Sequence, residues 1–184
     1  MTQTVTLAST SPFRRELLQR LGMSFLTAAP DVDESPLAKE TAVALVRRLS
    51  ENKARAVAAT HPGLVIGSDQ VATTENNILG KPGTHERAFE QLRELSGKRI
   101  TFQTGLCLLN TATDEALVDV IPYTVKFREL AVQQIERSLQ QAQPYHCAGS
   151  VRSEGLGITL FEYMEGRGPT ALIGLPLLRL TRLL

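Results

Sequence analysis

Short apolar runs bounded by turn-forming residues predict strands along the chain. The run at residues 64–68 is continuously apolar and too short for a buried helix, so we expect a central strand that ends at Asp69. Other runs alternate apolar with polar residues, and two pairs of them, each joined by a short turn, predict hairpin-like pairing. The further strands are predicted at residues 5–8, 24–29, 71–74, 78–79, 100–110, 115–127 and 156–163.

Apolar residues at spacings of three or four predict the helices. The first follows directly on the first strand, because Ser11 supplies a hydroxyl cap and Pro12 suits the first helical position. Its apolar stripe ends at Leu21, and Gly22 is a stop signal. The other helices are predicted at residues 42–60, 84–95, 132–141 and 176–184. Strands and helices mixed along one chain without repeats or linkers predict a single α/β domain spanning residues 1–184.

Composition fits one ordinary globular domain, since 184 residues of which 42% are hydrophobic can bury a single core. The 20 basic and 19 acidic residues nearly cancel, so we expect neither a nucleic-acid polymer nor a membrane as partner. The N-terminus lacks a secretory signal, and no run approaches the roughly 18 apolar residues of a membrane span. With only two cysteines, Cys107 and Cys147, we expect a soluble protein in the reducing cytoplasm.

A first candidate site is the predicted strand-to-helix junction at residues 9–15. A helix start offers free backbone N–H groups and the positive end of the helix dipole, which both favour anions. Ser9, Ser11 and Arg14 add two hydroxyls and a guanidinium fork that can bind phosphate. A capping motif with solvated arginines explains these residues about equally well.

Asp69 is the second candidate, at the end of the predicted central strand. A carboxylate at this edge of a sheet lies where α/β proteins bind ligands, and it can hold a metal or deprotonate water. Glu34, in an acidic loop, is another hard oxygen ligand suited to magnesium or manganese. Lys53 and Lys81 match the charge of a triphosphate. The alternatives are a turn cap at Asp69 and ordinary surface charge at the others.

Motifs of competing enzyme classes are missing from the sequence. There is no Gly-x-x-x-x-Gly-Lys-Ser/Thr loop, no Gly-x-Gly-x-x-Gly after a strand, and no Cys-x-x-Cys pair. Adjacent side chains diverge in an extended segment, so His146 and Cys147 do not predict a Cys–His nucleophile pair. Phosphate-loop NTPases and dinucleotide-dependent dehydrogenases are therefore excluded.

Several short motifs, taken in order, resemble the Maf family. Residues 7–15 read Leu-Ala-Ser-Thr-Ser-Pro-Phe-Arg-Arg, which is similar to the N-terminal signature of that family. The later matching motifs are Asp33-Glu34, Asn52-Lys53-Ala54, Gly67-Ser68-Asp69, Gly80-Lys81-Pro82 and Gly174-Leu175-Pro176. Because the motifs span essentially the whole chain, the resemblance is far more specific than any one of them.

The resemblance implies an inosine triphosphate pyrophosphatase-like (Maf/Ham1) fold, an elongated mixed β-sheet flanked by helices, with two lobes, a central cleft and usually a homodimer. It also implies hydrolysis of a nucleoside triphosphate to the monophosphate and pyrophosphate with a divalent metal cation, magnesium or manganese. Carried onto this sequence, Asp69 is the catalytic acidic residue and Glu34 a second one, both as metal ligands. The implied phosphate-binding residues are Ser11, Arg14, Lys53 and Lys81, with the two lysines counted among the catalytic residues, and we also expect Ser9 to bind the substrate.

Three positions distinguish subfamilies of the Maf family. Many Maf proteins similar to dTTP/UTP pyrophosphatases have arginine, threonine and glutamine where this chain has Phe13, Gln70 and Glu154. The set found here resembles the subfamily that acts on 7-methyl-GTP, which usually has tryptophan at the first position. N7-methylation gives guanine a positive charge, which an aromatic face and a carboxylate attract and an arginine would repel. A core aromatic at Phe13 and a solvated turn residue at Glu154 are the plainer interpretations.

The sequence therefore favours hydrolysis of 7-methyl-GTP, and it leaves two alternatives. One is a Maf enzyme of the dTTP/UTP type. The other is a nucleotide-binding regulator of cell division without meaningful catalysis, against which the acidic residues and Lys53 argue.

Overall fold

The computed structural model describes residues 3–75 and 77–184, and within them a single mixed sheet contains seven strands. Its strand order is β2-β1-β3-β5-β6-β7, and β4 pairs with β3. The strands are β1 (Val5–Ala8), β2 (Leu26–Ala28), β3 (Leu64–Thr73), β4 (Ile78–Leu79), β5 (Arg99–Asn110), β6 (Glu115–Phe127) and β7 (Phe161–Gly166). The α-helices are α1 (Pro12–Gln19), α2 (Ala42–Ala58), α3 (His85–Leu95), α4 (Val132–Ala142), α5 (Thr170–Ile173) and α6 (Leu177–Leu180). The expected mixed α/β sheet flanked by helices is confirmed.

The chain divides into two compact units. The described residues of the first unit belong to Met1–Gln70, Gln103–Ile121 and Arg167–Leu184, and those of the second to Val71–Phe102 and Pro122–Gly166. Strands β3, β5 and β6 therefore contribute residues to both units.

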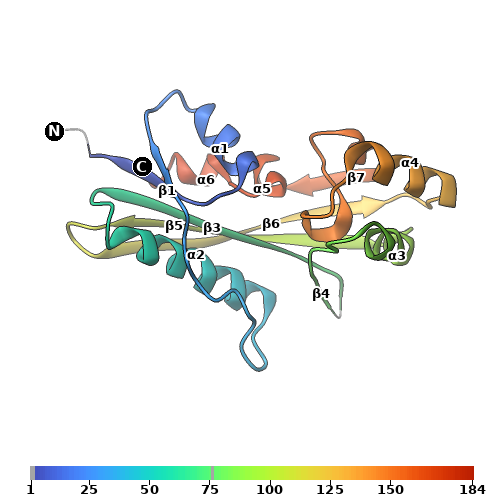
Figure 1. Cartoon of the computed structure of the whole chain (residues 1–184), viewed down its shortest axis with the longest axis horizontal. Coiled ribbons are helices and arrows are strands. Elements are labelled where there is room, and N and C mark those ends of the chain that lie inside the picture. Colours follow the sequence, from blue (N-terminus) through green and yellow to red (C-terminus); the bar gives the residue numbers. More distant parts are fainter. Residues whose placement is uncertain (1–2, 76) are drawn as a thin grey trace. The chain divides into compact units, whose positions relative to one another are not determined.

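Parallel strands β2, β1 and β3 form the framework of the first unit. Ala8 of β1 pairs with Ala28 on one side and with Gly67 on the other. Helix α2 covers one face of these strands, whereas α1, α5 and α6 lie on the opposite face (Figure 1). The core under α2 consists of Ala8, Ala54, Val57, Val65, Cys107 and Leu109.

Two glycines let α2 pack unusually close to the sheet. A Cβ at Gly67 would lie 2.0 Å from the Ser50 carbonyl oxygen, and a Cβ at Gly105 would lie 2.2 Å from that of Val46. With only hydrogen at these positions, the helix backbone approaches the strands more closely than a side chain would allow. Groups on the inner face of α2 are therefore held directly against β3.

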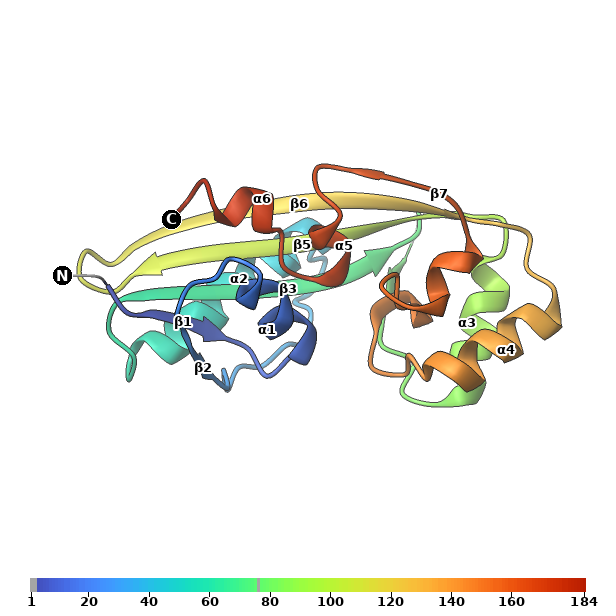
Figure 2. The same cartoon turned by 90° about the horizontal axis from the view of Figure 1, so that it is seen from above.

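The second unit carries α3 and α4 together with its parts of the sheet. The two helices lie side by side (Figure 2). Strand β7 pairs antiparallel with β6, matching Val125 with Met164. The rings of Phe127 and Phe161 meet edge to face with centroids 5.1 Å apart, a favourable aromatic arrangement.

The predicted end of the central strand at Asp69 is wrong. Strand β3 continues to Thr73, because its last residues pair antiparallel with β4, matching Thr73 with Ile78. The predicted hairpin of these segments is thereby confirmed, but its turn includes Asn76. Together with Met1 and Thr2 of the predicted 1–184 domain, Asn76 lies outside the described residues.

The predicted strand at residues 156–163 is confirmed only at its end, where residues 161–163 belong to β7, and is wrong before it, where Leu156–Leu160 form a 3-10 helix. An alternating strand would bury its apolar residues together, but Leu160 is buried whereas Ile158 is 48% exposed. The predicted closing helix at 176–184 is shorter, Leu177–Leu180, and α5 before it was not predicted. Within the described part of the chain, no helix combines the length and apolar character needed to cross a membrane.

Replacing Gly67 with alanine tests the close packing of α2. The new methyl group would meet the Ser50 carbonyl, so helix and sheet must move apart. Overpacking of this kind destabilises by roughly 1–3 kcal/mol, and we expect the free energy of unfolding measured in urea to fall by about that amount. The control is Gly80→Ala, where a Cβ would have nothing within 4 Å; it should change stability by less than about 0.5 kcal/mol. Equal losses in the two variants would contradict close packing at Gly67 as the cause.

Candidate active site

Two serine hydroxyls fix the junction between β1 and α1. Ser9 Oγ accepts a hydrogen bond from the Ser11 amide at 3.1 Å, and Ser11 Oγ accepts one from the Arg14 amide at 3.4 Å. Ser11 is thus the predicted N-cap of α1, which begins at Pro12. A hydroxyl that accepts a bond can still donate its own hydrogen to an anion. Capping and phosphate binding are therefore compatible at this junction.

A hollow of about 360 Å³ lies beside the junction. Its lining residues are Ser9, Thr10, Ser11, Pro12, Arg15, Glu16, Gln19 and Thr27. This volume is within the range of small-molecule sites. The turn that carries the two serines therefore borders space that can hold a phosphate group.

Arg14 extends from the first turn of α1 to the C-terminal segment of the same unit. Its Nε donates to the Gly174 carbonyl oxygen at 2.9 Å, and Ser68 Oγ donates to the same oxygen at 2.8 Å. Gly174 ends α5 with φ of 114°, in the left-handed region that favours glycine. Burial lowers the pKa of the Arg14 guanidinium, while the carboxylates of Asp69 and Glu34 act to raise it. Arg14 therefore lies in the field of both predicted acidic residues.

Lys53 joins these two carboxylates. Its Nζ lies 2.6 Å from Asp69 Oδ1 and 2.5 Å from Glu34 Oε1. Lys53 and Asp69 are only 5% and 7% exposed, whereas the Glu34 side chain is 52% exposed. Residues two apart on a strand share a face, so Asp69 lies on the same face as Gly67, which α2 covers. The close packing of α2 at Gly67 therefore brings the Lys53 ammonium to the Asp69 carboxylate.

The two predicted metal ligands, Asp69 and Glu34, converge on one point, which Lys53 Nζ marks by contacting both. Among the residues that the structure describes, no group of three or more His, Cys, Asp or Glu side chains could hold a metal ion. Magnesium usually keeps several waters and is bound through one or two carboxylates together with substrate phosphates. The donor set therefore fits a cation shared with a phosphate ligand rather than a closed protein cage.

Gln70 lies next to Asp69 on β3, and its side chain points to the opposite face. Its Nε2 donates to Thr104 Oγ1 at 2.9 Å and to the Ala171 carbonyl oxygen at 2.8 Å. The amide nitrogen thus ties α5 to the sheet. A contact between Gln70 and a base would have to use the carbonyl oxygen of the side chain.

The second unit holds the remaining predicted residues. Lys81 is exposed in the segment before α3. Glu154 Oε1 lies 3.7 Å from Arg152 Nε, and its Oε2 accepts a hydrogen bond from Ser153 Oγ at 3.2 Å. Burial raises the pKa of the Cys147 thiol, and Arg152, Glu154 and Lys81 have smaller effects on it. Lys81 and Glu154 therefore lie within electrostatic range of one thiol.

The predicted site residues are thus divided between the units. Those in the first unit are Ser9, Ser11, Phe13, Arg14, Glu34, Lys53, Asp69 and Gln70. Phe13 is half-buried on α1, next to Arg14. Hydrogen bonds, ion pairs and charge effects link six of these residues, Ser9, Ser11, Arg14, Glu34, Lys53 and Asp69.

The supporting roles of Ser68 and Gly174 were not predicted, although both belong to motifs noticed in the sequence. A glycine after an apolar stretch and before Leu-Pro is a signal for the end of a helix. That signal locates the backbone turn, but it does not reveal that the Gly174 carbonyl accepts from Ser68, 106 positions away.

Known proteins resemble this chain over nearly its whole length. The family model described as "Maf: Maf-like protein" matches residues 4–184. A protein of Nitrosococcus oceani named "7-methyl-GTP pyrophosphatase" is 58% identical over 98% of this chain and 92% of its own length. Proteins of the same name from Alcanivorax borkumensis and Pseudomonas aeruginosa are 54% and 55% identical, covering 100% and 97% of this chain and 93% of their own lengths.

Solved structures are more distant. The "Structure of a HAM1 protein from Coxiella burnetii" matches with a TM-score of 0.48 and 17% identity, over 70% of this chain and 75% of that chain. A likeness at this level supports no conclusion about the site or its chemistry.

Replacing Lys53 with methionine tests the buried ion pair. The variant leaves the Asp69 carboxylate buried without its ammonium partner, and breaking a buried pair in this way destabilises by roughly 3–5 kcal/mol. We expect the free energy of unfolding in urea at pH 7 to fall by about that amount. The double variant Lys53→Met/Asp69→Leu removes both charges and should recover most of the loss. A single variant as stable as the wild type would show that the pair is not effectively buried.

Proposed function

The chain belongs to the Maf-like protein family, and from that premise we propose that it hydrolyses 7-methyl-GTP to 7-methyl-GMP and pyrophosphate. The observation that carries the proposal is the cluster in which Lys53 joins Asp69 and Glu34, both of which act electrostatically on Arg14 in the first turn of α1. Positive groups suited to a triphosphate and carboxylates suited to a cation and a water lie together there. The names of the relatives support the choice of nucleotide.

In the proposed complex the triphosphate binds at the start of α1. The hydroxyls of Ser9 and Ser11 donate to phosphate oxygens, and the helix dipole favours their negative charge. Arg14 and Lys53 add positive charge from the two faces of the sheet that α1 and α2 cover. Lys81 is proposed to bind phosphate only because it matches a phosphate-binding position of the Maf family.

The reaction is a displacement at the α-phosphorus. A water oxygen attacks that phosphorus, and the bond to the oxygen that bridges the α- and β-phosphates breaks, so that pyrophosphate leaves. Asp69, with Glu34, orients the water, and a carboxylate accepts its proton. Arg14 and Lys53 stabilise the negative charge that develops on the leaving pyrophosphate.

Asp69 and Glu34 are also the residues that would hold a divalent cation. Bound magnesium or manganese would supply positive charge against the phosphates and lower the pKa of water. Because Lys53 Nζ occupies the point on which both carboxylates converge, a cation and the ammonium compete for it. Binding of a nucleotide would resolve the competition by drawing the ammonium to a phosphate.

Phe13 and Glu154 are the proposed determinants of the base. The cationic ring of 7-methylguanine is attracted to the face of an aromatic side chain, by about 0.5–2 kcal/mol depending on solvent exposure. Phe13 is half-buried on α1, so part of the residue is accessible to solvent. Glu154 is proposed to bind the base because it matches a position of the 7-methyl-GTP subfamily. Its ion pair with Arg152 must weaken before its carboxylate can contact the base. The homodimer and the cytoplasmic location likewise remain predictions.

A nucleotide panel decides between the candidate functions. Release of pyrophosphate would be measured with 7-methyl-GTP, GTP, UTP and dTTP, each with magnesium and with manganese. We expect the highest kcat/KM for 7-methyl-GTP. The highest value for UTP or dTTP would instead make the chain a dTTP/UTP-type enzyme. Saturable binding without any monophosphate product would favour a regulatory role.

Asp69→Asn tests the catalytic assignment. The amide keeps the shape of the side chain but removes the charge and the proton acceptor, so we expect kcat to fall at least about a hundredfold. Circular dichroism should show an intact fold. The matched control is Asp114→Asn, which alters a surface aspartate paired with Arg55 and should leave kcat unchanged. Wild-type turnover by purified Asp69→Asn would refute the assignment.

Phe13→Arg tests recognition of the methylated base. An arginine repels the cationic ring, so kcat/KM for 7-methyl-GTP should fall about tenfold or more relative to that for UTP. Phe13→Trp keeps an aromatic face and serves as the control, with the preference for 7-methyl-GTP retained. A uniform loss for every nucleotide in Phe13→Arg would mean that the residue contributes to packing rather than to specificity.

A further inference from the structure

The segment that carries Glu34 lies between β2 and α2 and has little packing of its own. In the described structure, none of residues 29–41 is buried and none belongs to a helix or strand. Glu34 is itself half-exposed, and its carboxylate contacts Lys53. Segments with few buried contacts open easily, so polar contacts must determine where this loop lies.

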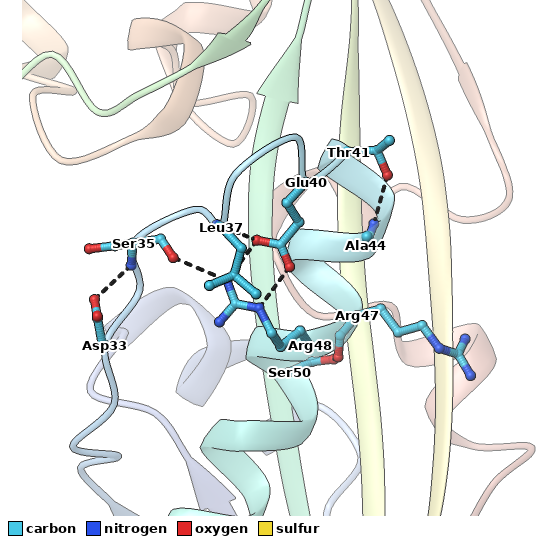
Figure 3. A network of polar contacts seen from close by, with 9 residues as sticks. All are labelled: Asp33, Ser35, Leu37, Glu40, Thr41, Ala44, Arg47, Arg48 and Ser50. Atoms are coloured by element: carbon cyan, nitrogen blue, oxygen red, sulfur yellow. Dashed lines mark hydrogen bonds and ion pairs between the residues drawn. The ribbon is translucent and has the colours of Figure 1, made fainter.

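Arg48 fastens this loop to α2 (Figure 3). Its Nε and Nη2 each lie 2.7 Å from one carboxylate oxygen of Glu40, which is a bidentate arrangement. Nη2 also donates to the Ser35 carbonyl oxygen at 3.1 Å. Glu40 Oε2 in turn accepts a hydrogen bond from the Leu37 amide at 2.9 Å. One guanidinium thus holds the backbone immediately after Glu34, directly at Ser35 and through Glu40 at Leu37.

The ion pair between Arg48 and Glu40 is fully charged near neutral pH. The hydrogen bond from Arg48, and after it the one from the Leu37 amide, lower the pKa of Glu40 to about 2. The bond to Glu40 raises the pKa of Arg48. On the other side of Glu34, Asp33 Oδ1 accepts from the Ser35 amide at 2.9 Å, which closes a local turn. The backbone that follows Glu34 is therefore held by charged side chains on two sides, by Asp33 at the Ser35 amide and by Arg48 at the Ser35 carbonyl.

Glu34 needs a second contact that fixes its position, because the proposed function gives Lys53 two roles. Lys53 pairs with the carboxylates before the substrate binds, and it contacts a phosphate afterwards. In the present arrangement its ammonium holds Glu34 and Asp69 together. When the ammonium turns to a phosphate, that hold on Glu34 weakens at the moment when its carboxylate is needed for the cation and the water. Arg48 lies five positions before Lys53 on α2, about 7.5 Å along the axis, and its contacts do not involve the ammonium.

We propose that Arg48 and Glu40 are positioning residues that keep Glu34 in place when Lys53 turns to the triphosphate. The inference rests on the proposed function of Glu34 and Lys53. Neither Arg48 nor Glu40 touches the nucleotide in the proposed complex. They order the loop before the substrate binds. The conformational entropy of the loop is therefore already lost when the reaction begins.

Arg48→Gln tests this role with two readouts. Hydrogen exchange of the Leu37 amide should accelerate at least about fivefold, because Glu40 is no longer held in place to accept from it. The manganese concentration for half-maximal turnover should rise about tenfold, as is common when a group that orients a metal ligand is lost. Arg48→Lys keeps the charge but cannot bridge Glu40 and Ser35 together, so it should fall between wild type and Arg48→Gln.

A double-mutant cycle with Glu34→Gln separates positioning from general stability. If Arg48 acts through Glu34, adding Arg48→Gln to Glu34→Gln should change kcat by less than about twofold. The matched control is Arg55→Gln, which removes another paired arginine of α2 whose partners are Glu51 and Asp114. It should alter neither the exchange of Leu37 nor the metal dependence.

Two results would overturn the positioning role. One is unchanged exchange of Leu37 in Arg48→Gln, and the other is an effect on kcat that persists in full beside Glu34→Gln. Failure of the proposed function looks different, since the wild type would then hydrolyse no nucleotide of the panel. The exchange of Leu37 would still decide whether Arg48 orders the loop.

Discussion

A buried ammonium placed between two carboxylates is the interaction on which the first unit depends. Removing Lys53 and Asp69 from water is unfavourable, and only short contacts between them offset that loss. The contact requires the backbone of α2 to lie against β3, which glycine at position 67 permits. The absence of a side chain at Gly67 thus determines whether the Lys53–Asp69 ion pair can form.

The opposite face of the sheet shows the same dependence of chemistry on packing. Arg14 begins on a helix whose start is capped by Ser11, and it ends at a carbonyl made available by the left-handed turn at Gly174. Gln70 ties the segment before that turn to β3 and Thr104. The phosphate recognition proposed for this face would therefore draw on a local cap and on a turn that is distant in the sequence.

The two acidic residues differ in a way that suits different tasks. Asp69 is fixed inside a strand and almost completely buried, so its position changes little. Glu34 stands on an exposed loop and is held by side chains. A rigid carboxylate and an adjustable one suit the proposed cation, which would arrive with the substrate, and the contacts of Arg48 hold the loop that carries the adjustable one.

The sequence by itself determined most elements and singled out three residues that the structure brings together. Caps, periodicity and turn residues act over a few positions, so the start of α1 at Pro12, helix α2 and the β3–β4 hairpin could be predicted. Motifs in order identified Glu34, Lys53 and Asp69 as a set, and the structure brings these three together.

Only the tertiary structure decided how far strands extend and what holds the site residues in place. Strand β3 passes Asp69 because β4 pairs with its end, and residues 156–160 form a 3-10 helix despite an alternating pattern. The bond from Arg14 to Gly174 spans 160 positions, and that from Arg48 to Ser35 joins a helix to an irregular loop. Such contacts arise between groups that no local pattern relates, because they depend on which surfaces meet when the chain packs.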